Sequence, residues 1–202
     1  MKRSITTMAV MFSLIGAGHA FAQSEPAGPG TLEIMIAPGG ETFFTQRNTG
    51  PSFGNYDLGA SLTYNVNSIV GVEAEFNGAL GISQSLQFGA LNGSVKTPNL
   101  VGYSGNVVVS ARRRASFIPY ATGGIGGLSL LQTTGLDINA TETFLTGNVG
   151  GGVKWYGGKR WGLRADYRFV TVQSQNDAPA FFGQTTRYGH RVYGGVVLNA
   201  LK

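Results

Sequence analysis

The stretch Trp161-Gly162-Leu163-Arg164-Ala165-Asp166-Tyr167-Arg168-Phe169 decides the fold of this chain. The side chains of an extended strand alternate between its two faces. One face therefore carries apolar and mostly aromatic residues, and the other carries two arginines and an aspartate. Two structures accept such a strand: a soluble β-protein with the apolar face in its core, or a membrane barrel with the apolar face toward lipid and the charges in its lumen.

The same alternation recurs along the chain and predicts eight strands, over residues 31–44, 56–66, 69–79, 99–111, 117–131, 142–156, 161–169 and 188–198. Pro38-Gly39-Gly40 predicts a bulge in the first strand. Glycines blur the alternation in the fifth strand, so its faces stay unassigned. Long loops (45–55, 80–96, 132–141 and 171–187) alternate with short turns. This rhythm is typical of an all-β, eight-stranded antiparallel up-and-down transmembrane barrel.

The chain begins with features of an exported protein. A basic start, an apolar run and Ala20-Phe21-Ala22 predict a signal peptide over residues 1–22, cleaved after Ala22. A flexible lead-in over 23–30 and a barrel domain over 31–202 follow. There is no cysteine, so no disulfide or thiolate metal site is expected. The small, scattered excess of basic residues does not indicate a nucleic-acid partner.

The polar faces of the strands favour the membrane barrel. Charged residues make up only 12% of the chain, which is low for a water-covered surface. The polar faces carry mainly small residues, which suit the narrow inside of an eight-stranded barrel. Their charges balance, with four of each sign: Asp57, Glu73, Glu75 and Asp166 against Lys154, Arg164, Arg168 and Arg191. Buried charges are tolerated when paired, so we predict a closed ionic plug in the lumen.

Aromatic residues on the apolar faces agree with this interpretation. Five of them lie toward strand ends, as the interfacial girdles of a membrane barrel require: Tyr56, Tyr64, Trp155, Trp161 and Tyr167. The alternative is that these side chains form the core of a soluble sandwich. Phe181-Phe182 in the last loop either form an exposed apolar contact or tuck against the barrel rim.

The chain resembles the small eight-stranded outer-membrane barrels of the OmpA/OmpX type. The resemblance rests on the predicted signal peptide and on three segments: 162–169, Phe117-Ile118-Pro119-Tyr120 with the glycine-rich strand after it, and Tyr193-Gly194-Gly195-Val196-Val197-Leu198. It implies a location in the bacterial outer membrane, outer-membrane lipids as surroundings and insertion by the barrel-assembly machinery. Members of this family usually end in an aromatic residue, whereas this chain ends Leu198-Asn199-Ala200-Leu201-Lys202, so Leu198 or Leu201 serves instead.

Catalytic and cofactor motifs give little signal. After the predicted cleavage site the chain has one histidine, His190, and His190-Arg191-Val192 does not match the His-x-Ser pair of the outer-membrane lipid A deacylases. We interpret His190 as a rim residue and expect no catalytic residue, cofactor or metal. The functional hypothesis is a monomeric, non-enzymatic barrel, structural or adhesive, that contacts an extracellular ligand through its long loops. A lipid-modifying enzyme and a narrow pore or small-ligand carrier remain the alternatives.

Overall fold

A computed structural model describes residues 28–45, 50–88, 91–111, 116–133, 136, 138, 140–158, 160–179 and 181–201. These residues form the strands β1 (Leu32–Phe44), β2 (Phe53–Asn65), β3 (Val70–Gly81), β4 (Ser83–Phe88), β5 (Leu91–Lys96), β6 (Leu100–Ser110), β7 (Phe117–Leu130), β8 (Glu142–Tyr156), β9 (Trp161–Val172) and β10 (Arg187–Leu201). The predicted signal peptide, 1–22, and most of the lead-in, 23–30, lie outside the described residues. No helix in the described part of the chain is long and apolar enough to cross a membrane.

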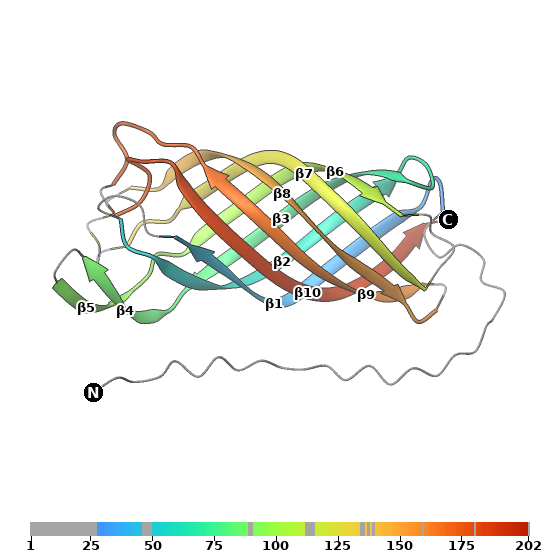
Figure 1. Cartoon of the computed structure of the whole chain (residues 1–202), viewed down its shortest axis with the longest axis horizontal. Coiled ribbons are helices and arrows are strands. Elements are labelled where there is room, and N and C mark those ends of the chain that lie inside the picture. Colours follow the sequence, from blue (N-terminus) through green and yellow to red (C-terminus); the bar gives the residue numbers. More distant parts are fainter. Residues whose placement is uncertain are drawn as a thin grey trace.

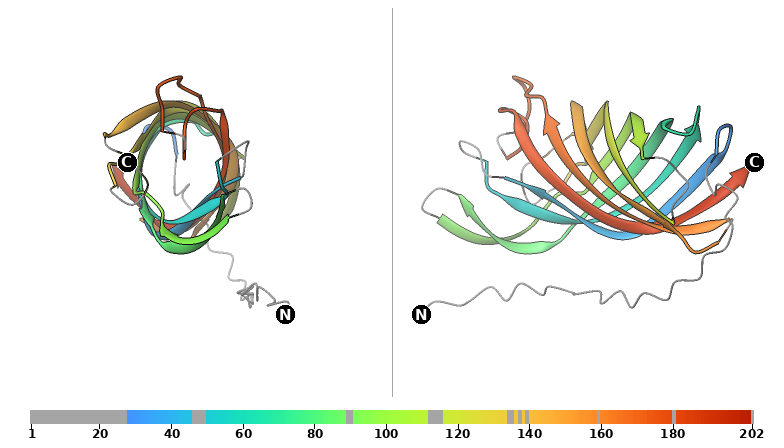
Figure 2. Two further views of the ribbon diagram at one scale, coloured as in Figure 1. Left: turned by 90° about the vertical axis from the view of Figure 1, so that its left-hand side faces the viewer. Right: turned by 45° about the vertical axis from the view of Figure 1, so that its right-hand side comes forward.

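Eight of the strands close into one antiparallel barrel, in the order β1-β10-β9-β8-β7-β6-β3-β2 (Figures 1 and 2). The seam joins the first and last strands, from Leu32 opposite Leu201 to Phe44 opposite Gly189. The predicted eight-stranded antiparallel barrel is therefore confirmed. Both ends of the described chain lie at the same end of the barrel, which we call the terminal end. We call the opposite end, with the long connections, the loop end.

The predicted bulge in β1 is also confirmed, because the pairing register shifts between Ile36 and Gly39 against β10 and between Ala37 and Gly40 against β2. The prediction of a simple loop over 80–96 is wrong. β3 continues to Gly81, and β4 and β5 then form a two-stranded hairpin that extends from the loop end (Figure 1). This segment is rich in Gly, Ser and Gln and lacks the alternating apolar residues by which strands are recognised in a sequence.

The loops 45–55 and 171–187 are shorter than predicted, since β2 begins at Phe53, β9 reaches Val172 and β10 begins at Arg187. In β7, whose faces the sequence left unassigned, the even-numbered side chains point inward: Ile118, Tyr120, Thr122, Leu128 and Leu130 are buried. Ile125 points outward and is 72% exposed. Pairing within the closed barrel thus determines which face of β7 points inward, although its glycines blur the alternation in the sequence.

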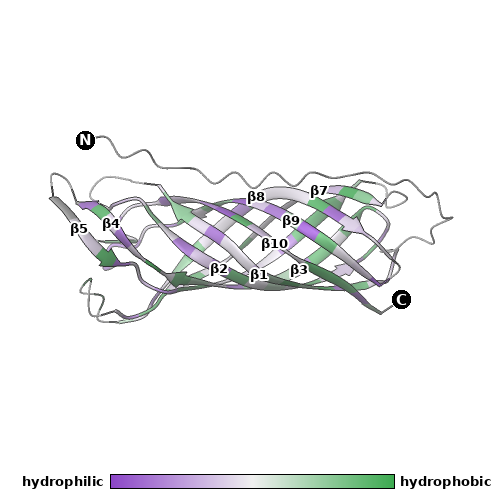
Figure 3. Cartoon of the chain, turned by 90° about the horizontal axis from the view of Figure 1, so that it is seen from below, coloured by the Kyte–Doolittle hydropathy of each residue, from purple (hydrophilic) through white to green (hydrophobic). Residues whose placement is uncertain are grey.

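The barrel has an apolar outside and a polar inside. Large apolar side chains are exposed on every barrel strand, among them Ile36, Leu62, Phe76, Val107, Ile125, Val149, Leu163 and Val196. Most charged side chains of β1, β2, β3, β8, β9 and β10 are buried within the barrel. Hydrophobic and hydrophilic residues accordingly alternate along the ribbons in Figure 3. A soluble protein would have a polar outer surface and an apolar inside. A barrel surrounded by lipid needs an apolar outer surface.

Glycines facing the lumen make room for its large polar side chains, and this gives a first testable prediction. A Cβ on Gly124 would collide with the Gly105 carbonyl and the Asn106 side chain. On the outward-facing Gly123, a Cβ would meet only the Asn148 carbonyl oxygen at 3.6 Å, an ordinary contact. We therefore expect Gly124→Ala to lower the free energy of unfolding by about 1–3 kcal/mol, and Gly123→Ala to leave it within about 0.5 kcal/mol. Urea unfolding of refolded barrels measures both, and equal effects would contradict the inward assignment.

Candidate functional site in the barrel lumen

Two arginines of β9 form the centre of an ionic network inside the barrel. Arg164 donates from Nη1 to Glu73 Oε2 and from Nη2 to Asp166 Oδ2, both at 2.5 Å. Arg168 reaches Glu73 Oε1 at 2.8 Å, Glu75 Oε2 at 3.0 Å and Asp166 Oδ1 at 2.8 Å. The side chains of both arginines are fully buried. Each guanidinium is therefore shared among carboxylates, which offsets the cost of removing its charge from water.

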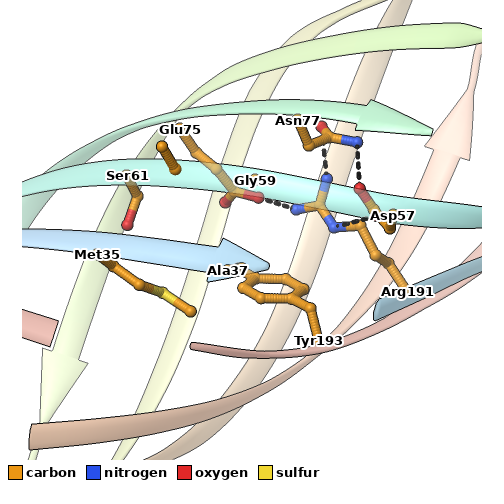
Figure 4. A pocket seen from close by; sticks show the side chains of 10 residues that line it. Met35, Ala37, Asp57, Gly59, Ser61, Glu75, Asn77, Arg191 and Tyr193 are labelled. Carbon is orange, nitrogen blue, oxygen red and sulfur yellow. Dashed lines mark hydrogen bonds and ion pairs between the residues drawn. The ribbon is translucent and has the colours of Figure 1, made fainter. Parts of the chain in front are cut away.

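Arg191 of β10 extends the network toward β2 and β3 (Figure 4). It donates from Nη2 to Glu75 and from Nη1 to the Asn77 side-chain oxygen at 2.8 Å, and its Nε lies 3.8 Å from Asp57 Oδ2. Asp57 also accepts hydrogen bonds from Thr42 Oγ1 at 2.5 Å and from Asn77 Nδ2 at 3.3 Å. These contacts join β1, β2, β3 and β10 across the lumen.

A separate ion pair lies nearer the terminal end, between Lys154 and Glu33. Glu33 also accepts a hydrogen bond from Asn65 Nδ2 at 2.7 Å. The buried apolar side chains Met35, Ala37, Ile118, Tyr156, Tyr193 and Val197 form a small cluster inside the barrel. All eight residues that the sequence placed in a lumen charge network thus lie inside the barrel, and each takes part in an ion pair: Asp57, Glu73, Glu75, Lys154, Arg164, Asp166, Arg168 and Arg191.

Several residues of this network were not predicted from the sequence. Glu33 lies on the face opposite Leu32 and Ile34, so alternation alone could have placed it inside. Tyr120 donates its hydroxyl proton to Asp166 and accepts a hydrogen bond from Arg164 Nε at 2.7 Å. The amides of Asn106 and Asn148 link the carboxylates to Arg168. These neutral residues gave no signal, because counting charges does not reveal which amides and phenols complete the hydrogen bonds.

The charges are unevenly divided along the chain. Four acids come from the first three strands: Glu33, Asp57, Glu73 and Glu75. Lys154, Arg164, Arg168 and Arg191 come from β8, β9 and β10, with Asp166 as the one acid among the lumen charges of these strands in the described chain. The ion pairs therefore connect the two ends of the sequence, across 91 residues for Arg164 and Glu73 and 121 for Lys154 and Glu33.

A group of buried apolar side chains lies at the loop end of the barrel. A cluster that we call the mouth cluster consists of Phe44, Phe53, Ala79, Leu86, Leu100, Leu128, Leu130, Ile138, Phe144, Val172, Ala178, Phe181 and Phe182. Phe182 is 1% exposed, and its ring centroid lies 5.1 Å from that of Phe44 and 5.6 Å from that of Phe144. The alternative that Phe181-Phe182 form an exposed contact is therefore wrong, and the loop after β9 instead places both rings over the lumen.

Two small cavities lie beside the ionic network. One cavity of about 10 Å³ lies beside Met35, Glu75 and Arg191, where Figure 4 shows the side chains, and another of about 30 Å³ lies beside Asn77, Asn148 and Arg191. A single water molecule needs about 10–15 Å³ by this measure, so each cavity has room for one or two water molecules at most. Within the described residues, no cluster of three or more His, Asp or Glu side chains is arranged to hold a metal ion.

The five residues of the predicted aromatic girdle all lie on the outer face, but not all at strand ends. Tyr64, Trp155 and Trp161 lie near the terminal end, where the two indole rings pack edge to face with centroids 6.0 Å apart. Tyr56 lies toward the loop end and donates a hydrogen bond to the Pro38 carbonyl at 2.8 Å. Tyr167 lies near the middle of β9, which corrects its placement at a strand end.

His190 lies on the outer face of β10, close to where that strand begins at the loop end. Its Nδ1 is 2.8 Å from the hydroxyl of Tyr167, and its ring packs edge to face against Phe169 with centroids 5.5 Å apart. The strand register also places it opposite Phe43 of β1. His190 therefore belongs to an aromatic patch on the outer wall and takes no part in the lumen network.

A closed barrel with an apolar outer wall and a buried ionic lumen defines an integral β-barrel membrane protein. A family model for the outer membrane protein beta-barrel domain matches residues 7–196. The chain belongs to this family, and its place is the bacterial outer membrane, surrounded by membrane lipid.

Solved structures agree on the fold. The outer membrane protein OprG from Pseudomonas aeruginosa is 12% identical and aligns with a TM-score of 0.52 over 87% of this chain and 98% of its own. Neisserial surface protein A is 14% identical and aligns with a TM-score of 0.58 over 85% of this chain and 98% of its own. At such low identity the likeness shows the fold alone. No curated protein sequence matches this chain significantly.

Proposed function

We propose that this protein is a non-enzymatic, closed barrel that stabilises the outer membrane and makes adhesive contacts outside the cell through its loop end. Outer-membrane barrels carry long loops on the extracellular side and short turns on the periplasmic side. On this rule the loop end, with the β4–β5 hairpin, faces outward. The single observation that carries the proposal is a lumen filled by ion pairs and closed by the mouth cluster, beneath a hairpin that extends beyond the barrel.

The hairpin has the features of a contact surface. Within the described chain its two strands pair only with each other, so each presents an edge that no described strand covers, and such edges accept strands of other proteins. Its base is fixed to the barrel: Gln84 exchanges two hydrogen bonds with the Gly54 backbone, at 2.6 and 3.2 Å, and Thr97 Oγ1 donates to Asn55 at 2.7 Å. A rigidly held ribbon loses little conformational entropy when it binds.

The alternatives receive less support. A conducting pore needs a continuous water-filled path, whereas the two cavities beside the network have room for only one or two water molecules each. A lipid-modifying enzyme needs a nucleophile next to its base. His190 instead has a tyrosine phenol as its hydrogen-bond partner and aromatic rings around it. We propose that the chain acts without catalytic residues, cofactor or metal, as a monomer.

The outer wall of the barrel and the end of β10 suggest the membrane and assembly partners. We propose that the barrel-assembly machinery inserts the chain and recognises the end of β10. Leu198 points outward there and is 43% exposed, so it supplies an apolar side chain where related barrels carry an aromatic one. The outer apolar wall then contacts outer-membrane lipids.

Adherence of bacterial cells expressing the protein to cultured epithelial monolayers tests the proposed function. Ser85 and Ser94 face each other across the hairpin and are exposed. The double variant Ser85→Glu/Ser94→Lys keeps a favourable cross-strand pair while it charges the ribbon against strand addition. We expect adherence to fall to the level of cells without the protein. Ser68→Lys, in the turn at the terminal end, is the matched control and is expected to adhere normally. Unchanged adherence of the double variant would refute contact through the hairpin.

A further inference from the structure

Arg187, the first residue of β10, is a buried cation that has no anionic partner among the described residues. It is 1% exposed, and among the described residues no carboxylate forms an ion pair with it. Its Nη2 donates to the Pro51 carbonyl, but Nε and Nη1 have no hydrogen-bond partner. The other buried basic side chains of the described chain, Lys154, Arg164, Arg168 and Arg191, are all ion-paired. The sequence argument had left Arg187 at the end of a loop.

Two aromatic rings of the described chain lie beside Arg187. Its guanidinium carbon lies 5.6 Å from the ring centroid of Phe182 and 6.0 Å from that of Phe53, both members of the mouth cluster. Contacts with ring faces offset part of the cost of burying a cation. They do not supply acceptors for the free N–H groups, and a buried charge that lacks them is destabilising. The position is thus better suited to binding an anion than to stabilising the barrel.

We propose that the loop end of the lumen binds an alkyl carboxylate, with its head group on Arg187 and its chain within the mouth cluster. A carboxylate accepts charge-assisted hydrogen bonds from a guanidinium, and its single negative charge matches the single unpaired cation. A phosphate monoester would bring nearly two charges into the same apolar space. The cluster has the aliphatic and aromatic side chains that surround the apolar part of a bound small molecule.

Phe181 and Phe182 now occupy the space that the alkyl chain would take. The turn that carries them is held by hydrogen bonds from Phe182 N to the Pro179 carbonyl at 3.0 Å and from Gln175 N to the Gly183 carbonyl at 2.8 Å, and Gln175 Nε2 also donates to the Thr143 carbonyl of β8 at 2.8 Å. Gly183 has a φ of +109°, which only glycine adopts readily. Packing holds the two rings against Phe44, Phe53 and Phe144. An alkyl chain can therefore replace the two rings without breaking a strand pair of the barrel.

The test uses the full barrel in lipid nanodiscs, with arginine labelled by ¹⁵N, and sodium octanoate as the probe. We expect octanoate to shift the Nε resonance of Arg187 saturably, while 1-octanol, which has the same chain without the charge, does not shift it. The Arg191 resonance of the ionic network serves as an internal reference. No shift with octanoate, or an equal shift with octanol, would overturn the proposal.

Variants separate binding from folding. Arg187→Met is expected to keep the heat-modifiable band of a folded barrel and to weaken saturable octanoate binding at least about tenfold, the factor that one charge-assisted hydrogen bond supplies. Arg160→Met, an exposed arginine at the terminal end, is the matched control and should bind normally. Arg187→Lys keeps the charge and should retain part of the binding, so the proposal stays testable if the methionine variant does not fold. Phe182→Ala should bind octanoate at least as tightly as the wild type, and weaker binding would contradict displacement of that ring.

Discussion

Replacing Glu73 by alanine is expected to lower the free energy of unfolding by about 3–5 kcal/mol, the cost of breaking a buried ion pair. The Glu73 carboxylate contacts Arg164 at 2.5 Å and Arg168 at 2.8 Å, and all three side chains are fully buried. Its removal leaves two guanidinium groups competing for the remaining acids. Urea titration in lipid vesicles measures the change, with the fluorescence of Trp155 and Trp161 as the signal.

Two further variants show whether the loss comes from unpaired charge. Glu142→Ala removes a carboxylate at the loop end of β8 that forms no ion pair with a described residue, and we expect a change within about 0.5 kcal/mol. The double variant Glu73→Met/Arg164→Met replaces a charged pair by apolar side chains and should recover part of the loss. If the double variant is no more stable than Glu73→Ala, the deficit comes from lost packing and the ionic account is wrong.

The second large effect concerns the outer wall. Val149 lies at the middle of β8, points outward and is 59% exposed. On a soluble protein, an arginine at such a position would change stability little. At the midplane of a bilayer it costs about 2–4 kcal/mol, so Val149→Arg is expected to destabilise the refolded barrel by that amount.

Thr143 provides the matched control, because it is exposed on the same face of the same strand but lies next to the loop end. Near the membrane interface an arginine costs about 0–1 kcal/mol, so Thr143→Arg should be almost neutral. Both free energies come from the same urea titration in vesicles. Equal effects at the two positions would mean that the lipid band does not cross β8 where the apolar side chains predict it.

The sequence predicted most of the barrel, for a physical reason. In a membrane barrel one face of every strand meets lipid and the other meets a narrow lumen, so strict alternation in segments such as 56–66 and 161–169 shows which residues share a face. The two faces of β7 could not be assigned in this way, because a glycine has no side chain that favours either the lipid or the lumen. Closure of the barrel fixes those faces instead, through pairing with β6 and β8.

The candidate site was less predictable. Charges on the polar faces identified most of the ionic network. Glu33 could also have been included, because alternation in the first strand places it on the face opposite Leu32 and Ile34. Arg187 was assigned to a loop because β10 begins one residue earlier than the alternation indicates. Its apolar surroundings depend on Phe53 and Phe182, which are distant in sequence. The surroundings of Arg187 depend on where the loop after β9 places Phe182. Alternation within strands does not determine the position of that loop.

The division of acids and bases between the two ends of the chain has a consequence for assembly. Before β10 meets β1, the carboxylates of the first strands are separated from the arginines of β9 and β10 with which they pair in the closed barrel. Contacts across such long sequence separations form late, since the entropy of closing the loop opposes them. Attraction between the oppositely charged ends then favours the closing encounter. Salt, which screens that attraction while the ends are still in water, slows closure more than it weakens the finished barrel.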